Sequence, residues 1–291
     1  MQGSEPFIGI KLLPCKTPEE LRKQLGRLQR AGFDGVEFAL DMFPLIIGGE
    51  ICPCWADLVG SVLKEFPLGY SAHIGRGLDM REKKDIAIHW NVLKSSIELC
   101  HWLGANPLVL HYEVQTEDPR VEKQFYDYHV RAADKAAELG VTLCIENIEV
   151  ERMLPVIEMV STIRHPNLKM TLDTGHGFLA SRHFGFDYLE MVEKAVPWVG
   201  HVHVNDNMGI FDPLRIDDRV AYDVEQMGYR RTFGRGDIHV PPFFGKVPLD
   251  GVFHFLRDYR EKFICEYTTE SFVPFDAAVS AAVRRHIIEA R

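Results

Sequence analysis

Several features are absent from the sequence, and each absence disfavours a class of protein. No apolar run approaches the ~18 residues that a bilayer span needs, and residues 1–6 lack the positive start and apolar core of a signal peptide. Positive charge is not in excess, because the formal net charge is −9, so no overall basic field favours nucleic acid or an anionic membrane. The six cysteines are scattered, which is typical of a reduced protein and not of a disulfide scaffold. We therefore expect a cytoplasmic protein with no membrane partner.

What the chain has is a strict alternation of strand-like and helix-like segments. Apolar or alternating runs predict eight strands, at residues 7–14, 35–40, 68–74, 107–111, 141–146, 168–173, 199–204 and 263–266. Helix patterns follow them near 17–32, 55–65, 84–103, 121–139, 154–163, 186–195, 249–260 and 276–291. Such alternation implies parallel strands joined by right-handed crossovers. Without a linker or a break in composition, it favours one α/β domain over residues 1–291, a closed (β/α)8 TIM barrel. No G-x-G-x-x-G follows the first strand, which disfavours an open dinucleotide-binding sheet.

The ends of the predicted strands carry side chains that can bind metal. All strands of a TIM barrel point their C-terminal ends at one mouth, so residues far apart in the sequence meet there. The residues concerned are His73, His111, Glu146, Asp173 with His176, His203 and Glu266. A single strand-end histidine is usually a structural hydrogen-bonding residue, but so many such ends together predict a metal site. Mixed carboxylate and imidazole ligands suit Zn2+, Mn2+, Co2+ or Fe2+.

These residues lie in motifs that resemble the xylose isomerase-like TIM-barrel superfamily, which holds sugar isomerases, sugar epimerases and endonuclease IV. The motifs run over nearly the whole chain: Ala72-His73-Ile74, Leu110-His111-Tyr112, Ile145-Glu146-Asn147, Leu172-Asp173 with Gly175-His176, residues 201–206, residues 234–239 and Cys265-Glu266-Tyr267. The resemblance to the epimerase branch implies one divalent cation, held by Glu146, Asp173, His203 and Glu266. It further implies that the two glutamates act as acid and base, that the cation stabilises an enediolate, and that His176 contacts a substrate oxygen.

The resemblance to endonuclease IV implies a larger ligand set, in which nine residues hold three zinc ions. Matching residue types are His73, His111, Glu146, Asp173, His176, His203, Asp237, His239 and Glu266. Asp237 and His239 match less well, because Gly234 and Gly236 precede them, whereas a Gly-x-Gly follows the pair in endonuclease IV. We expect Asp237 and His239 to line the site, and their role as ligands stays open. The number of ions, one or up to three, stays open with it.

Two connections are candidates for substrate contact. The connection at 207–235 is long for a βα loop and holds five arginines and five acidic residues. It is either a solvated excursion or a lid that brings arginines onto a phosphate or carboxylate. The apolar loop at 43–47 fits a substrate wall, a buried lid or a subunit contact in a homo-oligomer equally well.

Two enzymatic functions follow from these patterns. The first is a divalent-metal-dependent isomerase or epimerase of a sugar or sugar phosphate, in carbohydrate metabolism, acting by proton transfer through a metal-stabilised enediolate. The ketose 3-epimerase subgroup carries a Gly-Glu-x-x-Arg pattern after the residue matching His203. Residues 205–208 lack this pattern, which argues against membership of that subgroup.

The alternative is an endonuclease IV-like zinc phosphodiesterase that acts on abasic DNA. No stripe of basic residues supports it, since the loop after the third strand has only Arg76 and Arg81 before a lysine pair. We therefore do not expect nucleic acid as a partner. A third class, a barrel that uses the pocket for binding or for lyase chemistry on a modified sugar or polyol, stays open.

Overall fold

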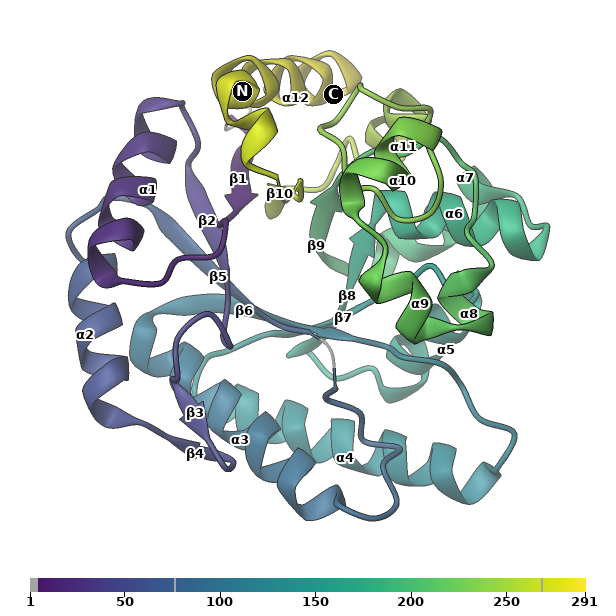
Figure 1. Ribbon diagram of the computed structural model, residues 1–291. Helices are drawn as coiled ribbons and strands as arrows, with labels where there is room; N and C mark the ends of the chain where they lie inside the picture. The colour runs from purple at the N-terminus through teal and green to yellow at the C-terminus, as the bar shows by residue number, and fades with distance from the viewer. Residues whose placement is uncertain (1–4, 76, 268) are drawn as a thin grey trace.

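A computed structural model describes residues 5–75, 77–267 and 269–291. Eight parallel strands close into a barrel in the order β1-β10-β9-β8-β7-β6-β5-β2, with helices around it (Figure 1). The strands are β1 (Phe7–Lys11), β2 (Gly35–Ala39), β5 (Gly69–Ile74), β6 (Ala105–His111), β7 (Leu143–Glu146), β8 (Leu168–Asp173), β9 (Val199–Val204) and β10 (Lys262–Cys265). The structure therefore confirms the predicted (β/α)8 TIM barrel, while the assignment of 1–291 to one domain stays a prediction. The predictions made from residues 1–4 and Arg76 lie outside the described residues. Within the described ranges, no helix is both long and apolar enough to cross a membrane.

The outer helices follow the strands in the predicted order. They are α1 (Pro18–Arg30), α2 (Pro53–Leu63), α3 (Ile86–Leu103), α4 (Pro119–Glu138), α5 (Met153–Ile163), α7 (Tyr188–Ala195), α11 (Leu249–Phe255) and α12 (Asp276–Ala290). Two 3-10 segments, η1 (Val196–Trp198) and η2 (Glu270–Phe275), precede β9 and α12. Helix α1 shows how local sequence sets these elements. The Thr17 hydroxyl accepts the first free N–H, from Glu20, at 3.2 Å. Leu21, Leu25 and Leu28 then form the buried face.

Three parts of the chain differ from the predicted pattern. A short hairpin, β3 (Ile46–Ile47) with β4 (Glu50–Ile51), occupies the apolar loop after β2. The first strand ends at Lys11 and not near residue 14, because the chain must leave the barrel to reach the start of α1. Helix α6 (Thr174–Phe184) starts directly after β8 and was not predicted, since its glycine-rich start is typical of a loop.

The apolar loop at 43–47 is a partly buried cover and not an open wall. Phe43 and Leu45 belong to the hydrophobic core, and the Phe43 ring stacks on Trp55 with centroids 5.3 Å apart. Only Ile47 projects strongly, with 62% of its surface exposed. The loop is absent from the lining of the pocket described below, which disfavours the substrate wall. A subunit contact stays a prediction.

The connection at 207–235 is folded into three short helices. They are α8 (Leu214–Asp217), α9 (Arg219–Val224) and α10 (Met227–Phe233), which lie beside the mouth of the barrel in Figure 1. Side chains from all three line the pocket at that mouth. We call residues 207–235 the lid. These helices are short, so the sequence patterns could not decide between a solvated excursion and a lid.

Candidate metal centre

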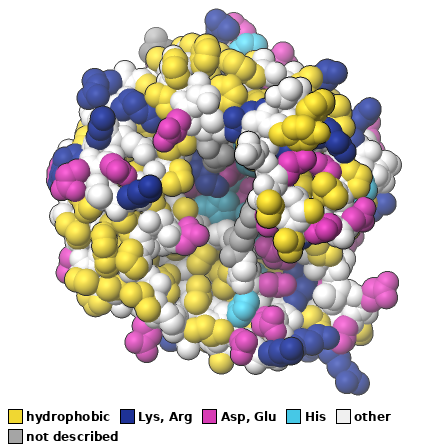
Figure 2. All heavy atoms as spheres, in the orientation of Figure 1, with side chains coloured by type: hydrophobic (Ala, Val, Ile, Leu, Met, Phe, Trp, Pro, Cys, Tyr) yellow, Lys and Arg dark blue, Asp and Glu magenta, His cyan; other side chains and the backbone are white. Residues whose placement is uncertain are grey.

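The C-terminal ends of the strands surround a pocket of about 420 Å³. In Figure 2 it is the hollow at the centre of the molecule, with histidine side chains visible at its floor. The barrel contributes Lys11, His73, His111 and Glu266 to the lining, among other residues. The lid contributes Arg215, Arg219, Tyr222, Met227 and Arg230. A polar floor of histidine and carboxylate thus faces a lid that carries arginines.

Four of the predicted ligands meet at the floor. The ligand atoms of Glu146, Asp173, His203 and Glu266 all lie within 4.8 Å of one another. His203 Nδ1 lies 2.9 Å from Glu146 Oε1 and 2.8 Å from Glu266 Oε2, and 3.7 Å from Asp173 Oδ2. All four side chains are buried. Three buried carboxylates at this spacing repel one another unless a cation lies between them.

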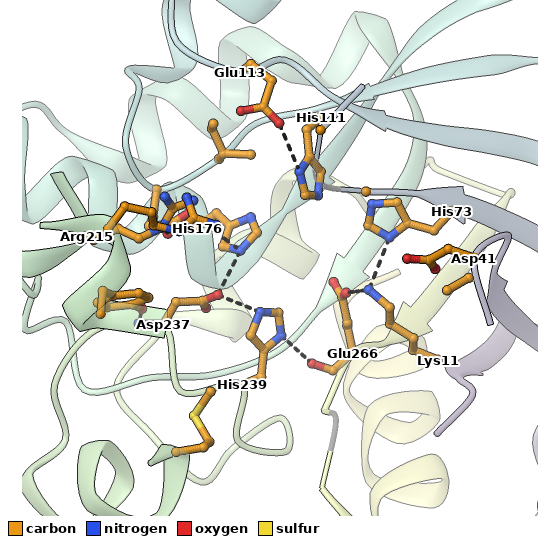
Figure 3. A pocket seen from close by; sticks show the side chains of 18 of the residues that line it. Lys11, Asp41, His73, His111, Glu113, His176, Arg215, Asp237, His239 and Glu266 are labelled. Atoms are coloured by element: carbon orange, nitrogen blue, oxygen red, sulfur yellow. Dashed lines mark hydrogen bonds and ion pairs between the residues drawn. The ribbon is translucent and has the colours of Figure 1, made fainter. Parts of the chain in front are cut away.

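Two further clusters flank this central cluster. On one side, His73 Nε2 and His111 Nε2 lie 3.3 and 3.5 Å from Glu146 Oε2. On the other side, Asp237 Oδ2 lies 3.3 Å from His176 Nε2 and 2.8 Å from His239 Nε2 (Figure 3). The structure thus brings all nine predicted residues to one mouth. It also joins Asp237 and His239 to His176, a grouping that the sequence left open.

Hydrogen bonds on the far side of each ring orient several histidines. His176 Nδ1 lies 3.1 Å from a backbone oxygen of the β7–α5 loop, and His239 Nδ1 lies 2.8 Å from the backbone oxygen of Glu266. A carbonyl only accepts, so Nδ1 carries a hydrogen, and Nε2 is the nitrogen that can present a lone pair to a cation once it has lost its own proton. His203 is turned the other way: its Nε2 forms an ion-pair contact of 2.9 Å with Glu37 Oε1, and its Nδ1 faces the carboxylates of the central cluster. Backing of this kind is typical of metal-binding histidines.

Asp173 is held by its neighbours on both sides. Its backbone N–H donates to Asn147 Oδ1 at 3.0 Å, and Asn205 Nδ2 donates to Asp173 Oδ2 at 2.7 Å. The other carboxylate oxygen of Asp173 caps helix α6 by accepting the backbone N–H of His176 at 2.7 Å. The start of α6 lies so close to Asn205 that a Cβ on Gly175 would overlap the amide oxygen. Gly175 is therefore required for this packing.

Charges of both signs are packed at the floor. Burial alone would lower the pKa of His203, but the carboxylates around it, Glu266 first, raise that pKa well above its usual value. Burial would raise the pKa of Glu146, yet His203 beside it holds that pKa well below its usual range. Lys11 also stays a cation, because Glu266 and Glu37 outweigh its burial and raise its pKa further. The glutamates of the central cluster are therefore ionised and available to a cation.

Asp173 behaves differently from the glutamates. Burial raises the pKa of Asp173 to about 7; His176 opposes this rise and the charge of Glu146 adds to it. In the outer cluster, His239 and His176 hold the pKa of Asp237 low against the effect of burial. Asp237 in turn outweighs burial to raise the pKa of His239 to about 9. Because a carboxylate ligand must be ionised, cation binding is coupled to loss of the Asp173 proton.

Unpaired oxygens test whether these residues fit a cation. Within the described residues, Glu146 Oε2, Glu266 Oε2 and Asp237 Oδ1 are buried and accept no hydrogen bond. Buried polar atoms without a partner are rare and costly. Glu266 belongs to the central cluster and Asp237 to the His176–Asp237–His239 cluster. Glu146 is shared between the central cluster and the His73–His111–Glu146 cluster. The residues present therefore fit one divalent cation in the central cluster, and the flanking clusters could hold others.

Several residues of the site were not predicted from the sequence. Lys11 and Glu37 are single charged residues inside apolar strands, and that contrast was the signal that could have revealed them. Glu113 lies 3.5 Å from His111 Nδ1 and has a φ of 60°, in the left-handed region. Glu149 pairs with Arg215 of the lid. These two depend on loop conformations, which no pattern in the sequence reports.

The comparisons with known proteins agree with this geometry. A family model described as xylose isomerase-like TIM barrel matches residues 25–288. The chain belongs to this family. Among solved structures, a xylose isomerase-like TIM barrel protein from Mycobacterium smegmatis in complex with magnesium is 15% identical, with a TM-score of 0.72, covering 99% of this chain and 98% of that one.

Sugar epimerases are also among the solved structures that are similar to this chain. L-ribulose 3-epimerase is 16% identical, with a TM-score of 0.70, covering 98% of this chain and 96% of that one. D-psicose 3-epimerase from Clostridium cellulolyticum H10, solved with D-tagatose, is 13% identical, with a TM-score of 0.69, covering 97% of this chain and 99% of that one. No curated protein matches the sequence. At these identities the structural likeness shows the shared fold.

Proposed function

We propose that the protein is a divalent-metal-dependent isomerase or epimerase of a sugar or sugar phosphate. The central cluster of Glu146, Asp173, His203 and Glu266 carries this proposal. It joins two ionised glutamates, one at the end of β7 and one directly after β10, at one histidine. It opens into a pocket of about 420 Å³, a size suited to a small ligand. The similar solved structures include sugar epimerases, one of them solved with D-tagatose, and this likeness supports the same substrate class.

The residues suggest how the reaction proceeds. A divalent cation held by the central cluster would polarise substrate oxygens next to the carbon that loses its proton. Glu146 and Glu266 both have pKa values below the usual range: their burial opposes this shift, but His203 outweighs it. Both are therefore ionised in the resting protein, as a group that accepts a proton from carbon must be, and we infer that they form the acid and base pair. His176, whose Nε2 faces the pocket side of the centre, is suited to hold a substrate oxygen.

The lid would exclude water during proton transfer. Arg215 of α8 pairs with the buried Glu149 of the β7–α5 loop, and this contact ties the lid to the barrel. Arg230 of α10 lies flat on the Tyr222 ring, 3.4 Å from its centroid, and pairs with Glu225 at 3.2 Å. Both arginines line the pocket, where they could meet a phosphate or carboxylate of the substrate. A cytoplasmic location and a homo-oligomeric state stay predictions.

The test uses the two glutamates. Glu146→Gln and Glu266→Gln should each lower turnover at least about 10²-fold, because general acid–base groups contribute 10²–10⁴-fold. Turnover would be followed by NMR on ketoses, aldoses and their phosphates, with the enzyme loaded with Mn2+, Co2+ or Zn2+. Glu158→Gln, on the exposed face of α5, is the matched control and should keep wild-type turnover. Full activity in either site variant, with the fold intact, would refute the paired-carboxylate mechanism.

One observation favours a second candidate, a metal-dependent phosphodiesterase. The three clusters lie side by side and Glu146 is shared by two of them, as three neighbouring cations would require. Two or three cations around one phosphate are suited to hydrolysis of a phosphodiester. Cleavage of duplex DNA with an abasic site, together with salt-sensitive binding to it, would favour this candidate. If neither is seen with the metal-loaded protein, the candidate fails.

A further inference from the structure

Lys11 lies at the edge of the metal centre and has no part in the mechanism above. It is the last residue of β1, and its side chain reaches the pocket, where 18% of its surface is exposed. Its ammonium group pairs with Glu266 Oε1 and lies 3.1 Å from His73 Nδ1 (Figure 3). The ammonium therefore bridges a central ligand and a ligand of the flanking His73–His111–Glu146 cluster.

The contact with Lys11 decides which nitrogen of His73 carries the hydrogen. His73 Nδ1 also lies 3.5 Å from Glu37 Oε1, but the ammonium is nearer, at 3.1 Å, and can only donate, so Nδ1 accepts its hydrogen bond. A neutral imidazole then has its hydrogen on Nε2, which lies 3.3 Å from Glu146 Oε2 but makes no hydrogen bond to it. A metal ligand needs a lone pair at that position and not an N–H. His176 and His239 show the opposite arrangement, because carbonyl oxygens fix their Nδ1 as the donor.

Charge acts in the same direction. A divalent ion bound by His73, His111 and Glu146 would be separated from the Lys11 ammonium by a single neutral imidazole ring, whereas in the central cluster the negative charge of Glu266 lies between the ammonium and the ion. The two positive charges would repel each other in a buried setting where water screens them poorly. The flanking His176–Asp237–His239 cluster has no lysine or arginine in hydrogen-bond contact with its histidines among the described residues. The two flanking clusters are therefore chemically unequal.

We propose that Lys11 is a built-in cation of the site, which keeps the His73–His111–Glu146 cluster free of metal and contacts substrate. An ammonium group has three N–H bonds, and Glu266 and His73 take two of them. The third is available to an oxygen of a substrate in the pocket that Lys11 lines. A donor placed there stabilises negative charge that develops on that oxygen. This substrate contact rests on the proposed isomerase function, whereas the effect on metal binding does not.

Metal counting tests the proposal without any substrate. Wild-type protein and Lys11→Met would be saturated with Zn2+, desalted and measured for zinc per chain. Lys11→Met should bind one ion more per chain than the wild type, because methionine fills a similar space without a charge or an N–H donor. Lys11→Arg, which keeps the charge, and Lys16→Met, which removes an exposed lysine nearby, should match the wild type. Equal zinc contents in wild type and Lys11→Met would overturn the proposal.

Anomalous diffraction from zinc-soaked wild-type crystals provides a check that needs no variant. A peak at the central cluster and none between His73 and His111 is expected, and a peak between these two histidines would overturn the proposal. In turnover assays, Lys11→Met should lower kcat about 10²-fold, as loss of a charge-stabilising donor does elsewhere. If wild-type protein converts no sugar, the proposed function fails, and the zinc content still decides the effect of Lys11 on metal binding.

Discussion

Glu37 offers the sharpest test of how the centre is supported. It is fully buried on β2, below the pocket, and its Oε1 lies 2.9 Å from His203 Nε2. Its Oε2 accepts the Ser71 hydroxyl at 3.1 Å. Burial opposes ionisation of Glu37, but the neighbouring histidines, His203 first, hold its pKa well below the usual range. The carboxylate therefore holds the His203 ring with Nδ1 toward the carboxylates of the central cluster.

Glu37→Gln keeps the shape of this side chain and removes its charge. An amide has one acceptor oxygen where the carboxylate has two. If its NH2 group faces Ser71, the hydroxyl must turn to accept from it; if it faces His203, the His203 N–H loses its acceptor. One buried donor without a partner costs about 1–3 kcal/mol of folding stability. Loss of a carboxylate behind a metal-binding histidine typically weakens metal binding 10- to 100-fold, which is about 1.4–2.8 kcal/mol.

Calorimetric titration of the metal-free protein with Mn2+ or Zn2+ would measure the change. Glu98→Gln is a matched control, because Glu98 is a partly exposed residue of α3 that pairs with Lys135 at 3.5 Å, away from the site. It should bind metal as the wild type does. A Glu37→Gln protein that is folded and binds metal with wild-type affinity would show that His203 needs no support from Glu37.

Three further outcomes are expected. Gly175→Ala should cost about 1–3 kcal/mol of unfolding free energy, because the added methyl overlaps a buried asparagine, whereas Gly228→Ala has open space and should cost nothing measurable in urea unfolding. Burial raises the pKa of Asp173 to about 7, so in metal-free protein its protonated form stabilises the fold below pH about 4. This contribution is lost as the pH rises through about 7, and the melting temperature of wild type relative to Asp173→Asn should fall over that window. Arg215→Met breaks the ion pair between the lid and the barrel and should destabilise the closed lid by about 3 kcal/mol. A less stable closed lid should show faster tryptic cleavage within residues 207–235 and a higher KM. Unchanged cleavage would contradict the role of Arg215 in holding the lid.

Sequence patterns predicted the barrel and the positions of the inner candidate ligands well, because both depend on short-range order. Each strand has a period of two and ends at a common mouth, so His73, His111, Glu146 and Glu266 could be placed without any knowledge of the loops. The same reasoning missed Glu37, which lies within a strand and not at its end. Its burial is tolerated because histidines and a serine surround it.

Asp237 and His239 show where sequence reasoning stops. About thirty residues separate them from His203, and their position depends on how the lid helices return the chain to the barrel. Gly234 and Gly236 have φ angles of 63° and 71°, which allow the chain to reverse after α10. A backbone bridge between Asp206 and Val240 then fixes the pair beside His176. None of these contacts leaves a periodic signal.

Deuterium incorporation during turnover is the most direct test of the proposed chemistry. The metal-loaded enzyme would be given its sugar substrate in D2O, and the product would be examined by NMR at the carbon whose configuration or oxidation state changes. If Glu146 and Glu266 accept and return a proton, one solvent deuterium should appear at that carbon in the product, and Glu146→Gln should abolish it. Product that forms without any deuterium at that carbon would contradict proton transfer by this carboxylate pair.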